Sequence, residues 1–204
     1  ITTVHEGGRT GLTATAVCSL TAEPARILIC VNKTASAHDP IAQGGPFCVN
    51  ILGTQHVTIA NRFAGRADVD GEARFKADAT WVTLATGAPV LADALASFDC
   101  TVNARFDYGT HTIYVGDVRA AAARAGTPLL YSGGAFMTTA SFTSRIEPPR
   151  RRLRDRPSSV TISISQVCSP VWRQSKSAVM SLGRPSACLN VMRAAMAVAL
   201  LAGV

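Results

Sequence analysis

The stretch GLTATAVCSL, residues Gly11–Leu20, decides which fold the sequence predicts. The hydroxyl residues Thr13, Thr15 and Ser19 alternate there with small or apolar residues, which is the pattern of a β-strand with one buried face. Small side chains let a flat ligand approach the backbone, and hydroxyl groups can both donate and accept hydrogen bonds. The stretch therefore indicates either an ordinary half-buried strand or one wall of a ligand site.

Short apolar runs separated by glycine-containing turns surround this stretch. We expect strands at 1–4, 11–20, 27–31, 47–52, 97–106, 111–121 and 128–131. One helix is expected over 36–44 with Ser36 as its N-cap, and a second after Thr54 with Val57, Ala60 and Phe63 on one face. A third short helical element is expected at 87–91. Many short strands with few short helices predict a mainly β fold, a β-barrel.

The charge is unevenly distributed along the 204 residues, which carry a net charge of +7. Residues 1–136 hold ten Lys and Arg against eleven Asp and Glu, whereas residues 137–204 hold ten against two. The excess positive charge therefore lies outside the predicted barrel. The segment 137–190 is rich in Ser, Arg and Pro and is expected to be mostly disordered. A nucleic-acid-binding function would rest on its arginines alone, and no interleaved aromatic motif supports it.

The cysteines and the apolar runs indicate the compartment. The six cysteines include no Cys-x-x-Cys pair, so we expect no metal site. Cys18, Cys30, Cys48 and Cys100 lie in or beside strand-like runs, as buried free thiols do in a reducing, cytoplasmic setting. No stretch reaches the roughly 20 apolar residues of a membrane-spanning helix, so we expect no membrane association.

Five segments, taken in order, resemble the flavin reductase-like family. They are GLTATAVCSL (11–20), ILICVNKTAS (27–36), PFCVNIL (46–52), RFAGR (62–66) and GTHTIYVGDV (109–118). The resemblance covers Ile1 to about Phe136. It implies an FMN-binding split barrel of Greek-key type that transfers hydride from NADH or NADPH to free FMN or FAD. It also implies a homodimer whose reduced flavin diffuses to a partner flavin-dependent monooxygenase.

The resemblance assigns candidate roles to residues of three segments and to one histidine. The flavin contacts that it implies come from Thr13, Ala14, Thr15, Ala16, Asn32, Lys33, Thr34, Ala35, Ser36, Phe63, Ala64 and Gly65. A lysine, hydroxyls and backbone amides suit the flavin phosphate, and Arg66 is either a further phosphate contact or a surface residue. His111 is the candidate catalytic residue, beside the nicotinamide. We expect the first two segments to surround one concave site.

The sequence departs from the family pattern at two places. Thr110 stands where an acidic residue often precedes the histidine, and Ala135 and Phe136 stand where a basic residue and a tyrosine are common. These departures keep a second function open, a non-catalytic flavin-binding electron carrier or sensor on the same fold. Oxidation of NADH by the purified protein would distinguish the two.

The order of the segments predicts a circular permutation. Members of the family begin with a helix that leads into the first strand, whereas this sequence opens on Ile1-Thr2-Thr3-Val4. Residues 191–204, VMRAAMAVALLAGV, resemble the missing part. We therefore expect a barrel at 1–136, a linking segment at 137–190, and a helix and half-strand at 191–204 that complete the barrel beside Ile1. The alternative is an unrelated apolar tail.

Overall fold

The structure, a computed structural model, describes residues 1–67, 69–76, 78–138 and 178–181. Its strands are β1 (Thr2–His5), β2 (Gly8–Gly11), β3 (Val17–Ala22), β4 (Ala25–Asn32), β5 (Phe47–Ile51), β6 (Trp81–Thr83), β7 (Pro89–Leu91), β8 (Ala96–Tyr108), β9 (His111–Ala123), β10 (Leu130–Ser132), β11 (Ala135–Met137) and β12 (Ala178–Ser181). Its helices are α1 (His38–Ala42), α2 (Val57–Phe63) and the short 3-10 turns η1 (Thr54–His56) and η2 (Gly71–Arg74).

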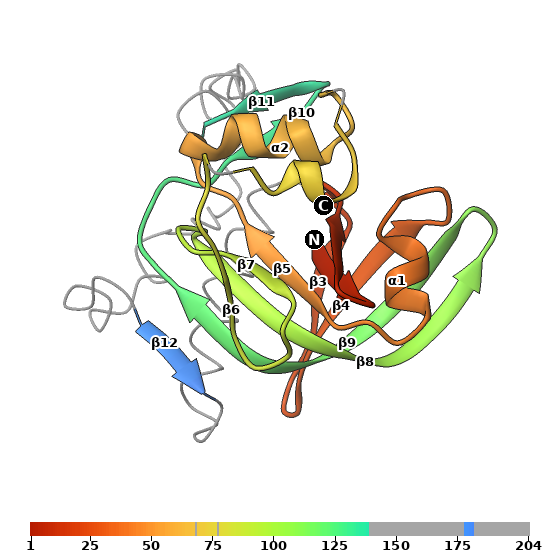
Figure 1. The fold of residues 1–204 in the computed structure, drawn as a ribbon. Helices are drawn as coiled ribbons and strands as arrows, with labels where there is room; N and C mark the ends of the chain where they lie inside the picture. The colour runs from red at the N-terminus through yellow and green to blue at the C-terminus, as the bar shows by residue number, and fades with distance from the viewer. Residues whose placement is uncertain (68, 77, 139–177, 182–204) are drawn as a thin grey trace, which may run out of the picture.

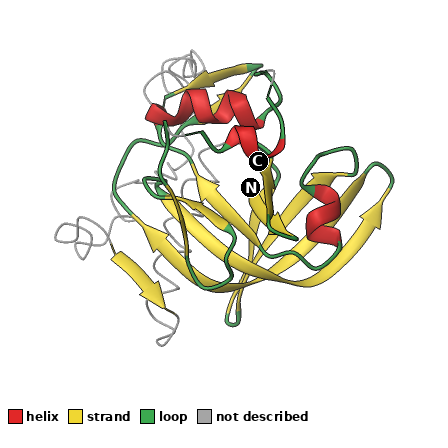
Figure 2. Ribbon diagram, in the orientation of Figure 1, coloured by secondary structure: helices red, strands yellow, loops and turns green. Residues whose placement is uncertain are grey.

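One curved antiparallel sheet forms the body of the molecule (Figure 1). Its strand order is β2-β1-β5-β8-β9-β4-β3, and β12 pairs with β9. The hairpin β8–β9, with 13 residues in each strand, runs through the middle of the sheet and bends with it. The short helices lie beside the sheet rather than within it (Figure 2). The structure confirms the expected mainly β architecture with few short helices.

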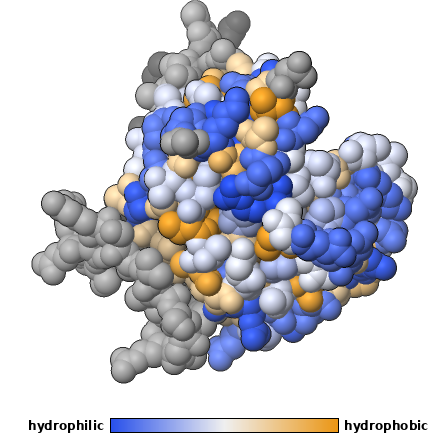
Figure 3. All heavy atoms as spheres, viewed as in Figure 1, coloured by the Kyte–Doolittle hydropathy of each residue, from blue (hydrophilic) through white to orange (hydrophobic). Residues whose placement is uncertain are grey.

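The core lies on the inner face of the curved sheet. In β4 the buried residues Ile27, Ile29 and Val31 alternate with half-buried ones, as expected of a strand with one face in the core. Phe47 of β5 and Tyr114 of β9 are fully buried in the same cluster. On the face shown in Figure 3, apolar residues reach the surface in small patches among polar ones.

The stretch 11–20 is two strands and not the single strand that was predicted. β2 ends at Gly11 and β3 begins at Val17. Between them, the Thr13 N–H donates to the Phe63 carbonyl at 2.9 Å, and the Thr13 hydroxyl donates to the Ala60 carbonyl at 2.8 Å. The end of α2 therefore takes the hydrogen bonds that a neighbouring strand would otherwise supply.

Two helix predictions also need correction. Residue 37, not Ser36, caps α1, and the Ser36 hydroxyl lies 3.1 Å from that of Thr10. Within the element predicted as helical at 87–91, residues Pro89–Leu91 form the strand β7, which pairs with β6 in the register Val82↔Val90. The helix after Thr54 is present, but Val57 is 36% exposed while Ala60 and Phe63 are buried.

The thiols are less uniformly buried than expected. Cys48 and Cys100 are buried, and burial raises the pKa of the Cys48 thiol, so it stays neutral. Cys18 is exposed because it lies on the outer face of the sheet, opposite Leu28.

Most of residues 137–204 lie outside the described residues. Within the segment expected to be mostly disordered, β12 is a strand that pairs with Ala120–Ala123 of β9. The predicted helix and half-strand at 191–204, and with them the predicted permutation, lie outside the described residues. Among the residues that the structure describes, no helix is long and apolar enough to cross a membrane.

A buried arginine ties α2 to the loop before β6, and its loss should destabilise the protein. Arg62 is 6% exposed and donates to the two carboxylate oxygens of Asp78 at 2.9 and 2.5 Å. We expect Asp78→Ala to lower the free energy of unfolding by about 1–2 kcal/mol, because it leaves a buried guanidinium unpaired while the half-exposed aspartate site admits water. Urea unfolding measures this change in stability.

The exposed neighbour variant Lys76→Ala should change stability by less than about 0.5 kcal/mol. Equal effects of the two variants would contradict the role given to the ion pair.

Candidate active site

Three of the predicted site residues lie at one end of the sheet. β4 ends at Asn32 and β9 begins at His111, and the register pairs these two residues. His111 also pairs with Tyr108, the last residue of β8. On the other side of β4, the Cys30 N–H donates to the Ala16 carbonyl at 3.0 Å. Ala16, Asn32 and His111 therefore lie on neighbouring strands or strand ends at the same edge.

The loop 32–36 is shaped by Asn32 itself. The side-chain oxygen of Asn32 accepts the Thr34 N–H at 2.9 Å and lies 3.0 Å from the Thr34 hydroxyl. The Lys33 N–H donates to the Thr110 carbonyl at 2.9 Å, which ties the loop to the turn between β8 and β9. Lys33, Thr34 and Ser36 are exposed. The loop thus presents the Lys33 cation to solvent near His111, while its two hydroxyls are hydrogen-bonded to Asn32, Thr10 and Arg74.

Arg74 connects this loop to the start of the stretch 11–16. One of its guanidinium nitrogens donates to the Gly11 carbonyl at 2.8 Å and lies 3.2 Å from the Ser36 hydroxyl. Arg74 is 7% exposed and also donates to Asp70 at 2.6 Å. The sequence analysis missed Arg74, because a single arginine in a charged turn carries no periodic or motif signal.

The third predicted segment lies at the end of α2. Phe63 is buried and accepts the Thr13 N–H, while Ala64 and Gly65 are exposed, and Gly65 ends the helix with a φ of +71°. Arg66 donates to the Tyr131 hydroxyl at 2.6 Å, and its guanidinium carbon lies 5.8 Å from the centre of the Phe136 ring. Phe136, one of the two departures from the family pattern, therefore holds Arg66 against the β10–β11 hairpin.

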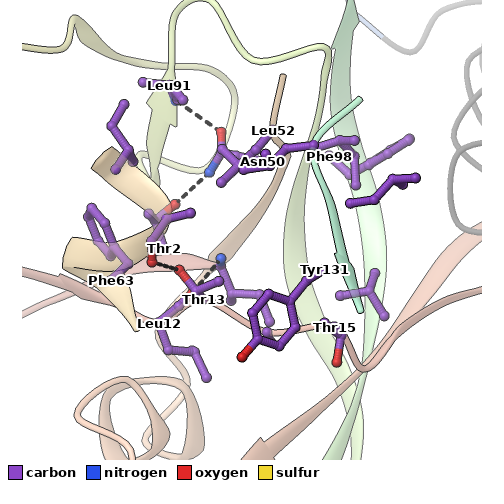
Figure 4. A pocket seen from close by; sticks show the side chains of 18 of the residues that line it. Thr2, Leu12, Thr13, Thr15, Asn50, Leu52, Phe63, Leu91, Phe98 and Tyr131 are labelled. Atoms are coloured by element: carbon purple, nitrogen blue, oxygen red, sulfur yellow. Dashed lines mark hydrogen bonds between the residues drawn. The ribbon is translucent and has the colours of Figure 1, made fainter. Parts of the chain in front are cut away.

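A cavity of about 190 Å³ lies beside the stretch 12–15. Thr13, Ala14, Thr15 and Phe63 line it, and Figure 4 shows Thr13, Phe63 and Tyr131 around it. Residues 32–36, Ala64, Gly65 and His111 are not among its lining residues. Residues 13–15 therefore border this cavity, while Ala16 lies by the loop at the sheet edge. That the first two segments surround one concave site stays a prediction.

His111 is half-buried at the first residue of β9, where the central strands of the sheet end. Its Nδ1 lies 2.9 Å from the hydroxyl of Thr110, the residue that replaces the acidic one of the family pattern. A hydroxyl rather than a carboxylate thus contacts this imidazole. Among the described ranges, no group of three or more His, Cys, Asp or Glu could hold a metal ion. The arrangement suits the binding and orientation of a planar ligand.

Comparison with known proteins identifies the family. The flavin reductase like domain matches residues 1–140. The chain belongs to the flavin reductase-like family. It is 46% identical over 139 residues to the FMN reductase (NADH) RutF 1 of a strain of Methylorubrum extorquens, a match that covers 68% of each chain.

Two solved flavin reductases share the fold. The chain is similar to the NADH:FAD oxidoreductase SgcE6 of Streptomyces globisporus C-1027 in complex with NAD and FAD fragments, at 31% identity and a TM-score of 0.60 over 74% of this chain and 85% of that one. It is also similar to BorF, the flavin reductase component of a bacterial two-component tryptophan halogenase. There the identity is 30% and the TM-score 0.62, over 67% of this chain and 86% of that one.

The charged groups beside the reductase site form a small network. The Thr112 hydroxyl donates to Asp107 at 2.5 Å, and Lys33 Nζ lies 3.8 Å from the same carboxylate. The hydrogen bond from Thr112, assisted by the positive charges of Lys33 and Arg105, lowers the pKa of Asp107. Asp107 therefore stays ionised and keeps Lys33 near the turn between β8 and β9.

The carboxylates of this reductase make its stability depend on acid pH. Hydrogen bonds from Arg9, Arg62, Thr112 and Arg26 lower the pKa values of Glu72, Asp78, Asp107 and Asp117, respectively. A folded-state pKa below the unfolded one means that unfolding takes up protons, so this stabilisation is present above the unfolded pKa values and is lost as the pH falls through the folded ones. We expect these carboxylates to make the urea midpoint fall as the pH drops below about 4. A midpoint that rises on acidification would contradict these assignments.

Proposed function

We propose that this chain is an NADH-dependent flavin reductase that acts on free FMN. The overall reaction would be NADH + H⁺ + FMN → NAD⁺ + FMNH₂, with the hydride passing from the nicotinamide to the flavin and the proton coming from solvent. The observation that carries the proposal is that Ala16, the loop 32–36 and His111 lie at one end of the sheet. The name of the RutF relative supports FMN and NADH over FAD and NADPH.

Each part of the site would contribute binding or orientation. The hydroxyls and backbone groups of the stretch 13–16 would hold the ring, and the loop 32–36 with Lys33 would hold the phosphate. His111 would orient the nicotinamide at the start of β9. Direct hydride transfer needs close approach and alignment of two bound rings, and no protein nucleophile or metal. The donor groups present in these segments fit that task.

The reduced flavin would leave the reductase and serve a flavin-dependent monooxygenase in the cytoplasm. BorF, a structural relative, is named as the flavin reductase component of a two-component halogenase, which supports a role in a two-component system. The exposure of Lys33, Thr34 and Ser36 in the loop 32–36 supports a site that exchanges its flavin with solvent.

We further propose that two copies associate through the outer face of the sheet. Cross-strand rows on that face are apolar, with Cys30 opposite Ile113 and Ile113 opposite Phe106. Phe106 is 52% exposed beside the half-buried Ile113 and Cys30, and an exposed aromatic side chain on an apolar row suits an interface. The rows end at the pair Asn32 and His111, so a second copy would lie next to the flavin site. Sedimentation of wild type and Phe106→Lys measures this: the variant should be the more monomeric.

The decisive experiment mixes the purified chain with NADH and FMN and follows the nicotinamide absorbance. We expect catalytic NADH oxidation, with a lower KM for FMN than for riboflavin, which lacks the phosphate. Lys33→Ala should raise the KM for FMN and leave that for riboflavin unchanged. A protein that binds flavin without oxidising NADH would instead support the electron carrier or sensor.

A further inference from the structure

His38, the first residue of α1, has no part in the proposed reaction, yet both nitrogens of its ring contact polar groups. The side chain is 13% exposed. Its Nδ1 lies 2.7 Å from a carboxylate oxygen of Asp39, and its Nε2 lies 3.0 Å from the Thr112 hydroxyl oxygen. Tyr114 packs edge-on against the ring and donates from its hydroxyl to the His38 carbonyl at 3.3 Å. The imidazole is therefore held in one orientation.

The hydrogen atoms available at these contacts decide which form of the imidazole fits them. Thr112 is 1% exposed, and its hydroxyl has a single hydrogen, which it donates to Asp107 at 2.5 Å. The Thr112 oxygen can then only accept, so Nε2 of His38 must donate. The ionised Asp39 carboxylate requires a hydrogen on Nδ1 in the same way. Either neutral tautomer leaves one contact without a hydrogen, whereas the imidazolium satisfies both.

The same hydrogen bonds lead from His38 to the loop 32–36. One oxygen of Asp107, Oδ1, accepts the Thr112 hydroxyl and lies 3.8 Å from Lys33 Nζ. Asp107 therefore divides its negative charge between a hydroxyl donor and an ammonium group. We call the series Asp39, His38, Thr112, Asp107 and Lys33 the relay. Its members come from α1, β9, β8 and the loop, so it joins four parts of the chain.

We propose that the protonated ring of His38 positions Lys33 through Thr112 and Asp107. When His38 loses the hydrogen on Nε2, the Thr112 hydroxyl turns to donate to that nitrogen, and Asp107 loses its donor. The carboxylate then pairs more closely with Lys33 and competes with any phosphate for the ammonium group. The consequence for flavin rests on the proposed function, in which Lys33 binds the phosphate of FMN. The affinity for that phosphate should therefore fall as His38 is deprotonated.

The other charged and titratable groups around His38 keep their charge near neutral pH. They are Asp39, Asp107, Lys33, Arg105, which donates to the Ala42 carbonyl at the end of α1, and Tyr114. The hydrogen bond from Thr112 lowers the pKa of Asp107, and burial raises the pKa of Tyr114. Histidine is the only side-chain type among them that ordinarily changes charge between about pH 5 and 8. A change in this range therefore reports on His38.

A pH titration followed by long-range proton–nitrogen NMR tests the relay without flavin. The chain has four histidines, and His38→Gln identifies the signals of His38 by their loss. We expect the neutral form of His38 to keep its hydrogen on Nδ1, because the Asp39 carboxylate accepts it there. A neutral form with the hydrogen on Nε2 would leave Thr112 donating to Asp107 and would overturn the proposal.

Flavin titrations from about pH 5 to 8 test the effect on Lys33. The quantity measured is the Kd for FMN divided by the Kd for riboflavin, which lacks the phosphate. His38→Gln keeps a donor for Thr112 without titrating, so division by its values cancels the titration of the FMN phosphate. We expect this quotient to rise about two- to fivefold as His38 loses its proton, with the midpoint of the NMR titration. A quotient that does not change with pH would overturn the proposal.

The variant Thr112→Val removes the hydroxyl donor from Asp107 at every pH. Its ratio of Kd values should exceed that of wild type at low pH, by about two- to fivefold, and should follow His38 no longer. The matched control Thr3→Val removes another buried threonine hydroxyl, which donates to the Pro46 carbonyl at 2.7 Å, and should match wild type. Equal effects of the two variants would contradict the relay. A chain that binds neither flavin would contradict the proposed function, and the tautomer of His38 would still decide the relay.

Discussion

Gly116→Ala is expected to lower the free energy of unfolding by about 3 kcal/mol, because the middle of β9 has no room for a methyl group. A Cβ at this position would lie 2.3 Å from Phe47 Cζ and 3.0 Å from Cys100 Cβ. Phe47 is fully buried in the core cluster and cannot move away without displacing its neighbours. The substitution therefore forces strain on the contact between β5 and β9.

Urea unfolding of a small set of variants tests this contact. Gly8→Ala is the matched control, because the nearest atom to its Cβ would be the His5 carbonyl oxygen at an ordinary 3.6 Å. It should change stability by less than about 0.5 kcal/mol. Phe47→Leu makes room, so the double variant should be less destabilised than the sum of the two single variants. If the destabilisations of the two single variants simply add in the double variant, the added methyl group does not press on Phe47.

Gly116 lies in a part of the fold that the sequence pattern predicts well. The sequence predicts strands at 97–106 and 111–121 separated by the turn Asp107-Tyr108-Gly109, and the structure confirms both strands but places the turn at Gly109 and Thr110. A glycine inside such a run indicates a bulge or a close approach of another group. Both occur here: the register shifts between Val102 and Ala104, next to the partner of Gly116, and the Phe47 ring packs on the glycine.

The incorrect predictions share a physical cause, which is competition from distant parts of the chain. Residues 87–91 are too few to show a period, and pairing with β6 decides that they form a strand. The stretch 11–20 has a strand pattern throughout, yet carbonyls of α2 capture Thr13 and interrupt it. Neither partner can be inferred from the local residues.

The sequence predicted which segments contribute to the candidate site, but it did not predict the side-chain contacts between them. The three segments and His111 were assigned from the family resemblance, and the register brings Asn32 beside His111. Arg74, which links Ser36 to Gly11, and Tyr131, which binds Arg66, were missed. Each forms a hydrogen bond with a residue more than 30 positions away in the sequence. No local motif encodes a contact of that kind.

His111→Ala is expected to lower kcat for flavin reduction about 10- to 100-fold while changing the Kd for FMN by less than about twofold. His111 lies at the start of β9, paired with Asn32 at the end of β4, where its imidazole would orient the hydride donor. Misplacement of a reacting group by about 1 Å can cost on the order of 100-fold in rate. An interaction made with the donor and not with the bound flavin should therefore appear in kcat and in the KM for NADH.

Stopped-flow reduction and flavin titration separate the two roles of His111. Thr110→Val keeps the imidazole and removes the hydroxyl 2.9 Å from Nδ1, so its rate should fall between those of wild type and His111→Ala. His5→Ala, a half-buried histidine in β1 away from this edge, should match wild type in both measurements. Equal losses of rate and of FMN affinity in His111→Ala would make His111 a flavin contact. The nicotinamide would then have to be oriented by another group at the same sheet edge, with the exposed Tyr108 opposite His111 as the next residue to substitute.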